Sequence, residues 1–331
     1  MFRGRKSSAM GALASLVAIL WLLGAVQAAA APKNSRWGPK YFPNYEVEAH
    51  TGERFRFYEE LIENKIVLFH FIYTNCGDIC PLQTARMKMV ADRLGDRLGR
   101  DIFIYTVTLE PEVDTAPVLA SLAEAFETPP GWLFLTGEPK QLAEIRYKLG
   151  ERSKQLIEHR HEMLWIGNDK TGRWRRYSMS ADLDRIAIEV LRADPEFRAA
   201  KVSLGRDYGV AKALDITKQR GRALFAKGCA ACHTIGEGAA LGPDLAGVTE
   251  RRKRDWLIDF IKEPQDMRAK KDPVALELDA AFPIAVMPRL GLSRTDIEDV
   301  LAYIEGVDGT AVENGGKPAA TTTPIADAPS R

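Results

Sequence analysis

Residues 66–73, IVLFHFIY, form a continuous apolar run rich in β-branched and aromatic side chains. Such a run is typical of a strand that is buried on both faces of a sheet. Cys76 follows closely, and Cys80-Pro81 then opens a segment in which apolar residues recur at helical spacing: Met87, Val90, Ala91 and Leu94. The stretch therefore predicts a strand, a short turn that carries Cys76, and a helix that begins at Cys80.

Strand-like and helix-like patterns alternate through residues 38–196. Further strands are predicted at 102–107, 132–135, 163–166 and 174–179, and helices at 119–126, 139–149 and 186–191. This order indicates an α/β fold, with helices covering both faces of a sheet. From residue 216 the pattern is helical with long loops. Its clearest helices are 217–228 and 293–305. Ser293 and Thr295 are the candidate N-caps of the second, and Thr295 with Glu298 matches a capping box.

The chain length, net charge and number of cysteines allow two domains and exclude few functions. A chain of 331 residues is long enough for two cores, and a net charge of +1 gives no indication of a nucleic-acid partner. The four cysteines fall into two motifs that use all of them, which leaves none for structural disulfides. We therefore expect the cysteine chemistry to be functional.

The first 30 residues are typical of an export signal. Arg3, Arg5 and Lys6 precede an apolar run at residues 10–26, and small residues follow at Ala28–Ala31. The alternative is an uncleaved membrane anchor through residues 10–26. Both predict a periplasmic protein, and removing the first 29 residues leaves a net charge of −2. Residues 197–215 are a predicted linker, and residues 307–331, rich in Gly, Pro, Thr and Ala, a disordered tail.

Cys76 and Cys80 form the first candidate site. A helix N-terminus favours the thiolate form, and sulfurs at positions i and i+4 of a helical turn share one face. Soft thiolates select copper(I), although the pair could instead form a disulfide that pins the turn. An imidazole is the expected third ligand, with His161 and His159 as the candidates.

The other two upstream histidines are less suited to this role. His70 lies inside the apolar strand and is predicted to be a core residue, whereas His50, in an early hairpin, is predicted to be solvated.

The second candidate site is Cys229-Ala230-Ala231-Cys232-His233, a Cys-x-x-Cys-His string typical of covalent haem c attachment. Cys229 and Cys232 would form the thioethers, and His233 would bind the iron from one side. Two methionines downstream are candidates for the other side, Met287, just before the last helix, and Met267, in a polar stretch.

Residues 38–196 resemble the Sco/SenC family. The resemblance rests on Cys76-x-x-x-Cys80-Pro81, on residues 106–115 (TVTLEPEVDT), on residues 131–137 (GWLFLTG) and on a late histidine before Gly167-Asn168. It implies a thioredoxin-like fold that holds copper through both cysteines and the late histidine, and that delivers copper to the CuA site of cytochrome oxidase or reduces that site. By spacing, His161 matches the family ligand, and His159 is the fallback.

Three positions near this site bear on the resemblance to the same family. Asp78 matches the family's acidic residue between the cysteines. Gly77 replaces a more frequent proline, and Glu110 replaces the usual aspartate of an Asp-Pro-Glu segment. Neither departure removes a ligand, so both bear on tuning rather than on binding.

Residues 216–306 resemble a class I cytochrome c domain, which is all-α. The matching features are Gly221-x-x-x-Phe225-x-x-x-Cys229, residues 241–245 (LGPDL), and Val286-Met287-Pro288 before a terminal amphipathic helix. The resemblance implies that Met287 is the sixth iron ligand and that Pro243 accepts a hydrogen bond from His233. Ligation by histidine and methionine favours electron transfer over oxygen chemistry.

Together these features predict a copper-binding, Sco-type chaperone or thiol redox protein for respiratory oxidase assembly, fused to a haem c electron carrier. The expected partner is the copper-bearing subunit of cytochrome oxidase or another periplasmic redox protein. A first alternative is a thiol–disulfide oxidoreductase that exchanges electrons with its own haem c. A second is a haem oxidase or peroxidase, which would need an open iron position. The charged segment 262–282 is predicted to be a loop, and the basic run 251–254 a solvated face or a docking site for an acidic redox partner.

Overall fold

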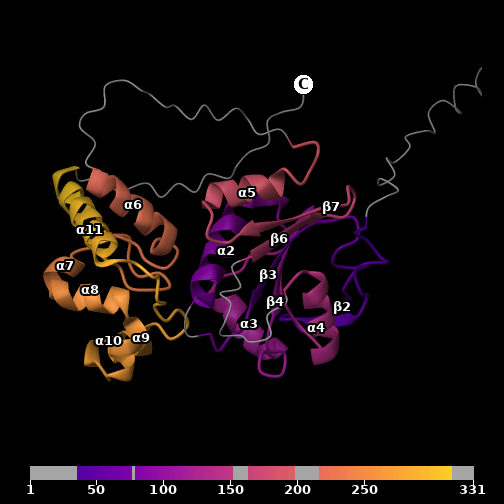
Figure 1. Ribbon diagram of the computed structural model, residues 1–331, viewed down its shortest axis with the longest axis horizontal. Coiled ribbons are helices and arrows are strands. Elements are labelled where there is room, and N and C mark those ends of the chain that lie inside the picture. The colour runs from indigo at the N-terminus through magenta and orange to yellow at the C-terminus, as the bar shows by residue number, and fades with distance from the viewer. Residues whose placement is uncertain (1–35, 77–78, 152–162, 198–215, 315–331) are drawn as a thin grey trace, which may run out of the picture.

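The computed structural model describes residues 36–76, 79–151, 163–197 and 216–314 (Figure 1). A seven-stranded sheet in the order β2-β1-β5-β4-β3-β6-β7 forms the centre of the first half of the chain. Its strands are β1 (Glu46–Ala49), β2 (Arg54–Arg56), β3 (Ile66–Ile72), β4 (Ile102–Thr108), β5 (Trp132–Thr136), β6 (Met163–Asn168) and β7 (Arg173–Ser178). The central strands β3, β4 and β5 run parallel, and the flanking strands pair antiparallel.

The apolar run that predicted the central strand is buried at every position of β3. Because side chains alternate across a strand, Leu68 and Ile72 join one core, and Val67 and Phe69 join the other. The first core lies under α2 (Cys80–Leu94), α3 (Ala116–Ala125) and α5 (Leu183–Leu191). The second lies under α4 (Pro139–Lys148) and the N-terminal segment 37–62. A sheet with helices on both faces is the thioredoxin-like α/β architecture that the sequence predicted.

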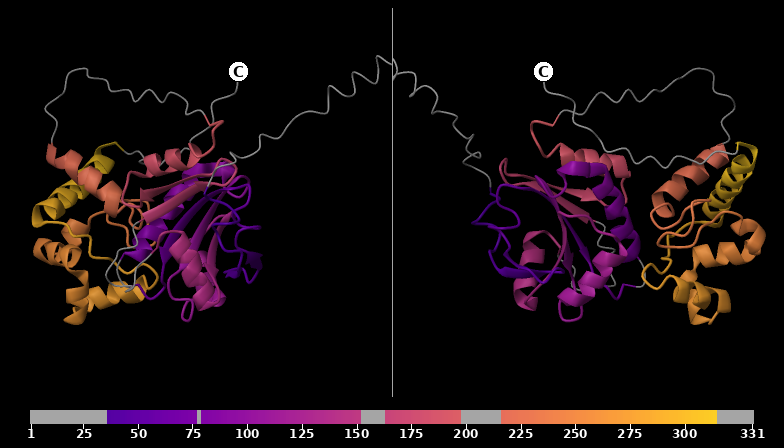
Figure 2. Two further views of the ribbon diagram at one scale, coloured as in Figure 1. Left: turned by 45° about the vertical axis from the view of Figure 1, so that its right-hand side comes forward. Right: turned by 180° about the vertical axis from the view of Figure 1, so that it is seen from behind.

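The second half of the described chain is a separate helical unit beside the sheet (Figure 2). Its elements are α6 (Ile216–Gly228), α7 (Val248–Arg251), α8 (Arg254–Lys262), α9 (Pro264–Ala269), α10 (Pro273–Ala281) and α11 (Arg294–Asn314). The core joins Phe225 of α6, Leu257 of α8 and Leu301 of α11. Gly221 lets α6 and α11 cross closely, since a Cβ placed there would lie 2.0 Å from the Asp299 carbonyl oxygen.

Three local predictions in this unit were wrong. The expected loop 262–282 contains helices α9 and α10, each with a proline in its first turn. The capping box of α11 is formed by Ser293 and Asp296, whose side chains accept from each other's backbone N–H groups, rather than by Thr295 and Glu298. Finally, α11 continues past residue 306 to Asn314, because no proline interrupts the segment before Pro318.

Other sequence predictions concern parts of the chain outside the described residues. These are the export signal or anchor at residues 1–30, nearly all of the linker at 197–215, and the end of the tail at 315–331. Phe197 is described, and it belongs to the core of the first domain. Within the described ranges, no helix combines the length and apolar character needed to cross a bilayer.

Candidate copper and haem sites

Cys76 and Cys80 lie where strand β3 passes into helix α2. Cys80 is the first residue of α2, and Pro81 fits the next position because the N–H that proline lacks would have no intrahelical acceptor there. Both thiols are buried, with 6% and 4% of their surface exposed, and neither forms a disulfide. The Cys80 backbone N–H donates to Cys76 Sγ at 3.4 Å. The two sulfurs therefore share one turn and are placed to act on one ligand.

A buried carboxylate holds the segment that leads to Cys76. Asp114 is fully buried and accepts hydrogen bonds from the Thr74 backbone N–H at 3.2 Å, from the Thr74 hydroxyl and from the Thr108 hydroxyl. These bonds join the end of β3 to the end of β4. The segment around Asp114 is recognisable in the sequence only as a family motif, and nothing in the local pattern indicates that its carboxylate supports the cysteine turn.

Two further groups set the polarity around Cys76. Burial, together with a hydrogen bond to Cys76, raises the pKa of Tyr73 well above its ordinary value. The phenol therefore remains protonated and can donate to the Cys76 sulfur. Burial and the nearby Asp114 carboxylate also raise the pKa of Glu110. A protonated phenol beside the sulfur favours the thiolate form, which is the form that binds metal.

The predicted third ligand lies outside the described residues, since both His161 and His159 fall in the segment 152–162. Asp78 and Gly77 are also outside them. Within the described ranges, no group of three histidine, cysteine or acidic side chains could hold a metal ion. The described part of the site thus supplies two soft sulfur donors, a set that fits copper(I), and the third donor remains a prediction.

The structure confirms that His70 is a core residue, with 1% of its surface exposed. Its Nε2 lies 2.5 Å from the Thr106 hydroxyl, which also accepts from the Trp132 indole N–H. Burial lowers the pKa of His70 to about 3, so the imidazole is neutral. His50 differs from the prediction of a solvated group, because it is half-buried and its Nδ1 accepts from the Phe134 backbone N–H.

The Cys-x-x-Cys-His string follows directly after α6 and curls back on that helix. The Cys229 N–H donates to the Phe225 carbonyl, and the His233 N–H donates to the Cys229 carbonyl. The His233 Nδ1 lies 2.9 Å from the Pro243 carbonyl oxygen, and since that oxygen can only accept, Nδ1 is the donor. This hydrogen bond fixes the tautomer and leaves Nε2 as the free lone pair for a metal.

Close packing and burial define the surroundings of His233. A Cβ on Gly242 would lie 2.7 Å from its ring, so only glycine fits beside the imidazole. Burial lowers the pKa of His233, against the opposing effect of the Pro243 hydrogen bond. Burial also raises the pKa of Cys232 to about 11 and that of Cys229 to about 12. Burial thus holds these two sulfurs as thiols rather than as the thiolates that bind free metal ions.

One apolar cavity brings His233 and Met287 together. Its walls come from the haem-string turn, from α8 and from α11, and include Cys229, Leu245, Trp256, Leu257, Phe260, Val300, Leu301 and Ile304. Met267, the rival ligand, is not part of this lining. An imidazole with an anchored Nδ1, a thioether sulfur, two free cysteines and apolar walls form a set that fits a covalently attached haem.

Sequence reasoning missed the residue that supports the Met287 segment. Arg268 on α9 donates from Nη1 to the Met287 carbonyl at 3.2 Å and pairs through Nε with Asp279 at 2.7 Å. The many charged residues of segment 262–282 are visible in the sequence, but a residue pattern does not show that Arg268 binds the backbone carbonyl of Met287. The basic run 251–254 is exposed as predicted, although Arg254 pairs with Glu298 and Glu305 of α11.

Comparison with curated proteins finds relatives of the first domain. The chain is 22% identical over 148 residues to the mitochondrial protein SCO1 homolog 1 of Arabidopsis thaliana, covering 42% of this chain and 43% of that protein. It is 32% identical over 75 residues to protein SenC of Rhodobacter capsulatus, covering 23% and 33%. The human mitochondrial SCO1 homolog is 25% identical over 135 residues, covering 38% and 44%. The chain spans less than half the length of each of these relatives.

Solved structures with similar chains include Bradyrhizobium japonicum ScoI with copper bound, at a TM-score of 0.38 and 18% identity, covering 45% of this chain and 97% of that one. Yeast Sco1 with copper bound gives a TM-score of 0.39 at 19% identity, covering 51% and 99%. The sequence model of the family described as SCO1/SenC matches residues 34–191, and the cytochrome c model matches residues 218–308. The chain is therefore a fusion of a SCO1/SenC domain with a cytochrome c domain that follows it.

Proposed function

We propose that this chain binds copper through Cys76, Cys80 and one imidazole, His161 or, failing that, His159, and that it serves in the assembly of a respiratory oxidase. The observation that carries the proposal is the pair of buried, free thiols on the first turn of α2 in a SCO1/SenC domain. Two sulfurs in one turn suit a soft ion, and burial protects such an ion from water and oxidants. The expected acceptor is the copper-bearing subunit of a cytochrome oxidase.

The second domain would carry a covalently attached haem between His233 and Met287. Both side chains line one apolar cavity, so each would supply one ligand to the iron. This ligand set suits an electron carrier rather than a haem oxidase or peroxidase, which needs an open position. His233 and Met287 would hold the haem iron, and Cys76 with Cys80 would hold copper; both groups, when bound, would supply one-electron redox chemistry.

The decisive experiment measures copper and haem per chain after expression in a host that exports and matures c-type cytochromes. Copper(I) affinity is then determined by competition with a chromophoric chelator. We expect one copper and one haem per chain, and a copper(I) affinity that falls by at least about a hundredfold in Cys80→Ser and His161→Ala. The matched variant His50→Ala should bind as the parent does. Unchanged affinity in Cys80→Ser would refute the copper site.

A thiol–disulfide oxidoreductase is the second candidate, because the two thiols share one turn and Tyr73 favours the thiolate of Cys76. The two functions differ in their need for an imidazole. Under the oxidoreductase proposal, His161→Ala and His159→Ala would keep the rate of exchange with a small disulfide, and copper would be incidental. Loss of copper binding with normal thiol exchange in these variants would leave both activities present and separable.

Export is part of the proposal, since haem c attachment and a cycling thiol pair both suit the periplasm. Cell fractionation decides it, because haem-stained protein should appear in the periplasmic or membrane fraction. The size of the mature chain distinguishes a cleaved signal from an anchor at residues 10–26.

A further inference from the structure

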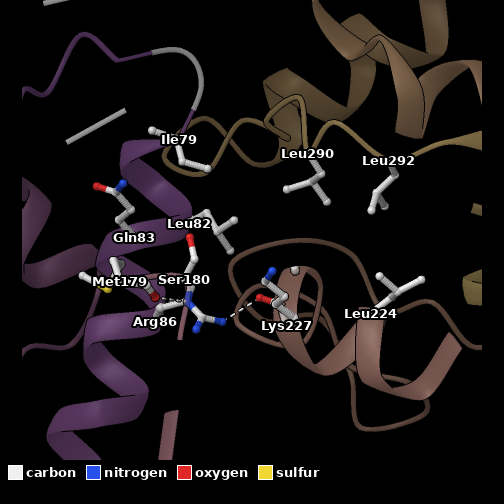
Figure 3. Close-up of a pocket in the computed structure, with 11 residues that line it drawn as sticks. Ile79, Leu82, Gln83, Arg86, Met179, Ser180, Leu224, Lys227, Leu290 and Leu292 are labelled. Atoms are coloured by element: carbon white, nitrogen blue, oxygen red, sulfur yellow. Dashed lines mark hydrogen bonds between the residues drawn. The ribbon is translucent and has the colours of Figure 1, made fainter. Parts of the chain in front are cut away.

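The two domains meet at a buried arginine on the helix that begins with Cys80. Arg86 of α2 is 4% exposed and donates to three backbone carbonyls: Met179 at 3.1 Å, Ala181 at 2.5 Å and Lys227 at 2.6 Å. The first two belong to the SCO1/SenC domain and the third to the cytochrome c domain. Figure 3 shows the guanidinium between the two domains, with its bond to Lys227 drawn.

The Lys227 carbonyl is an acceptor that its own helix leaves unused. Lys227 lies in the last turn of α6, where backbone carbonyls have no intrahelical N–H partner and the helix dipole is negative. A guanidinium is a favourable partner at such a position, because it offers several donors and a positive charge. Arg86 thus caps α6 from the neighbouring domain, two residues before the haem-attaching Cys229.

Apolar side chains from both domains surround this contact. Ile79 and Leu82 of the first domain face Leu224, Leu290 and Leu292 of the second across a shared pocket (Figure 3). Ile79 directly precedes Cys80, and Gly228, which also lines the pocket, directly precedes Cys229. The interface is therefore built from the residues adjacent to the first cysteine of the haem string and to the second thiol of the copper site.

We propose that Arg86 is a positioning residue that fixes the orientation of the cytochrome c domain against the helix carrying Cys80, so that the residues preceding Cys80 and Cys229 lie at one interface. The consequence for electron exchange rests on the proposed function, whereas the orientation itself does not. A role confined to the first domain would need only the bonds to Met179 and Ala181. The bond to Lys227 is the part that a local role does not explain.

The test compares Arg86→Met with a matched variant, Arg93→Met, in the haem-loaded full chain. Arg93 lies on the same helix, and its side chain bonds to Asp184 and Met89 within the first domain. Hydrogen–deuterium exchange is followed at peptides covering the last turn of α6 and the segment 286–292. We expect exchange there to accelerate at least tenfold in Arg86→Met and to stay at the parent rate in Arg93→Met. Equal exchange in all three proteins would overturn the proposal.

Leu290→Asp disturbs the same interface from the cytochrome side and keeps the test valid if Arg86→Met fails to fold. It should accelerate hydrogen–deuterium exchange at the first turns of α2, in the other domain. It should also broaden the distribution of interatomic distances obtained from small-angle scattering, because the domains would adopt more relative orientations. An unchanged α2 in this variant would also overturn the proposal.

A separate measurement distinguishes this proposal from the proposed function. Haem is reduced by a laser-generated one-electron donor in protein loaded with copper(II), and its reoxidation is followed. One outcome is that the parent protein shows no haem reoxidation while the hydrogen–deuterium exchange results are as expected. That outcome would refute electron transfer between the two sites and leave the positioning role of Arg86 in place. Where reoxidation occurs, it should slow at least tenfold in Arg86→Met at unchanged haem and copper content.

Discussion

At the scale of single residues, His70 shows how a buried titratable group links stability to pH. Its pKa is lowered by burial from an ordinary value of 6.5 to about 3. Below about pH 6.5, His70 is therefore protonated in the unfolded chain but stays neutral in the folded domain. The stability that the neutral imidazole provides is complete above this pH and is lost progressively as the pH falls toward 3.

We expect the free energy of unfolding of the SCO1/SenC domain to fall by up to about 1.4 kcal/mol per pH unit between about pH 6 and pH 4 on account of His70. Urea unfolding at a series of pH values measures this slope. His70→Leu should flatten it, whatever the variant does to absolute stability, whereas His50→Gln, at a half-exposed position, should keep most of it. A variant His70→Leu with the parental slope would contradict the assignment.

Asp114 carries a second prediction at this scale. Asp114→Ala leaves the Thr74 N–H and the hydroxyls of Thr74 and Thr108 without their buried acceptor. We expect a loss of about 3 kcal/mol in unfolding free energy, because each orphaned buried donor is costly. Copper(I) affinity should fall with it, since the segment before Cys76 loses its support. The neighbouring exposed Glu112→Ala should change neither quantity, and equal effects of the two substitutions would show that burial of Asp114 is irrelevant.

At the scale of elements, the crossing of α6 and α11 depends on one missing side chain. Gly221→Ala would place a Cβ 2.0 Å from the Asp299 carbonyl oxygen, so the helices must separate. We expect a loss of about 3 kcal/mol in the stability of the cytochrome c domain, because backbone on both sides prevents relaxation. Ala223→Gly, on the exposed side of the same helix, should cost only about 1 kcal/mol through helix propensity. Chemical unfolding followed by haem absorbance measures both, and a cost for Gly221→Ala no greater than for Ala223→Gly would exclude close packing.

Elements also show where sequence patterns suffice. β3 and α2 were predicted because apolar residues recur with the period of their own element, and that period is visible within one segment. Helices α9 and α10 were missed because they are short, and each begins at a first-turn proline. The start of α10 also depends on the Asp272 side chain, which accepts from the backbone N–H groups of Val274 and Ala275. Such short helices are held by their neighbours more than by their own periodicity.

At the scale of the whole molecule, the two domains have separate cores, and the interface around Arg86 joins them. We expect calorimetry of the haem-loaded chain to show two transitions. Leu301→Ala should lower the unfolding free energy of the cytochrome c domain, whose transition the haem absorbance follows, by about 3 kcal/mol. Leu68→Ala should lower the unfolding free energy of the SCO1/SenC domain by a similar amount. Each serves as the control for the other, and a single transition shifted by both variants would mean that the chain unfolds as one unit.

The division into an α/β and a helical domain could be read from the sequence. The motifs that carry the cysteines, His233 and Met287 are local, so the sequence also predicted which of these residues lie together, and their ligand roles stay predictions. The supporting residues could not be predicted. Asp114, Tyr73, Arg268 and Arg86 act on groups that lie far away in the chain or belong to the backbone, and residue types do not reveal such partners. The third copper ligand stays a prediction on the sequence alone.

The acceptor of the Arg86 bond is a main-chain oxygen, and every amino acid supplies one at position 227. Replacement of the lysine there would leave the link intact, so long as α6 still ends at the same residue. Insertion or deletion of a single residue in that last turn would instead rotate the oxygen away. The contact between the domains therefore depends on the number of residues between Phe225 and Cys229 and not on which side chain stands at position 227.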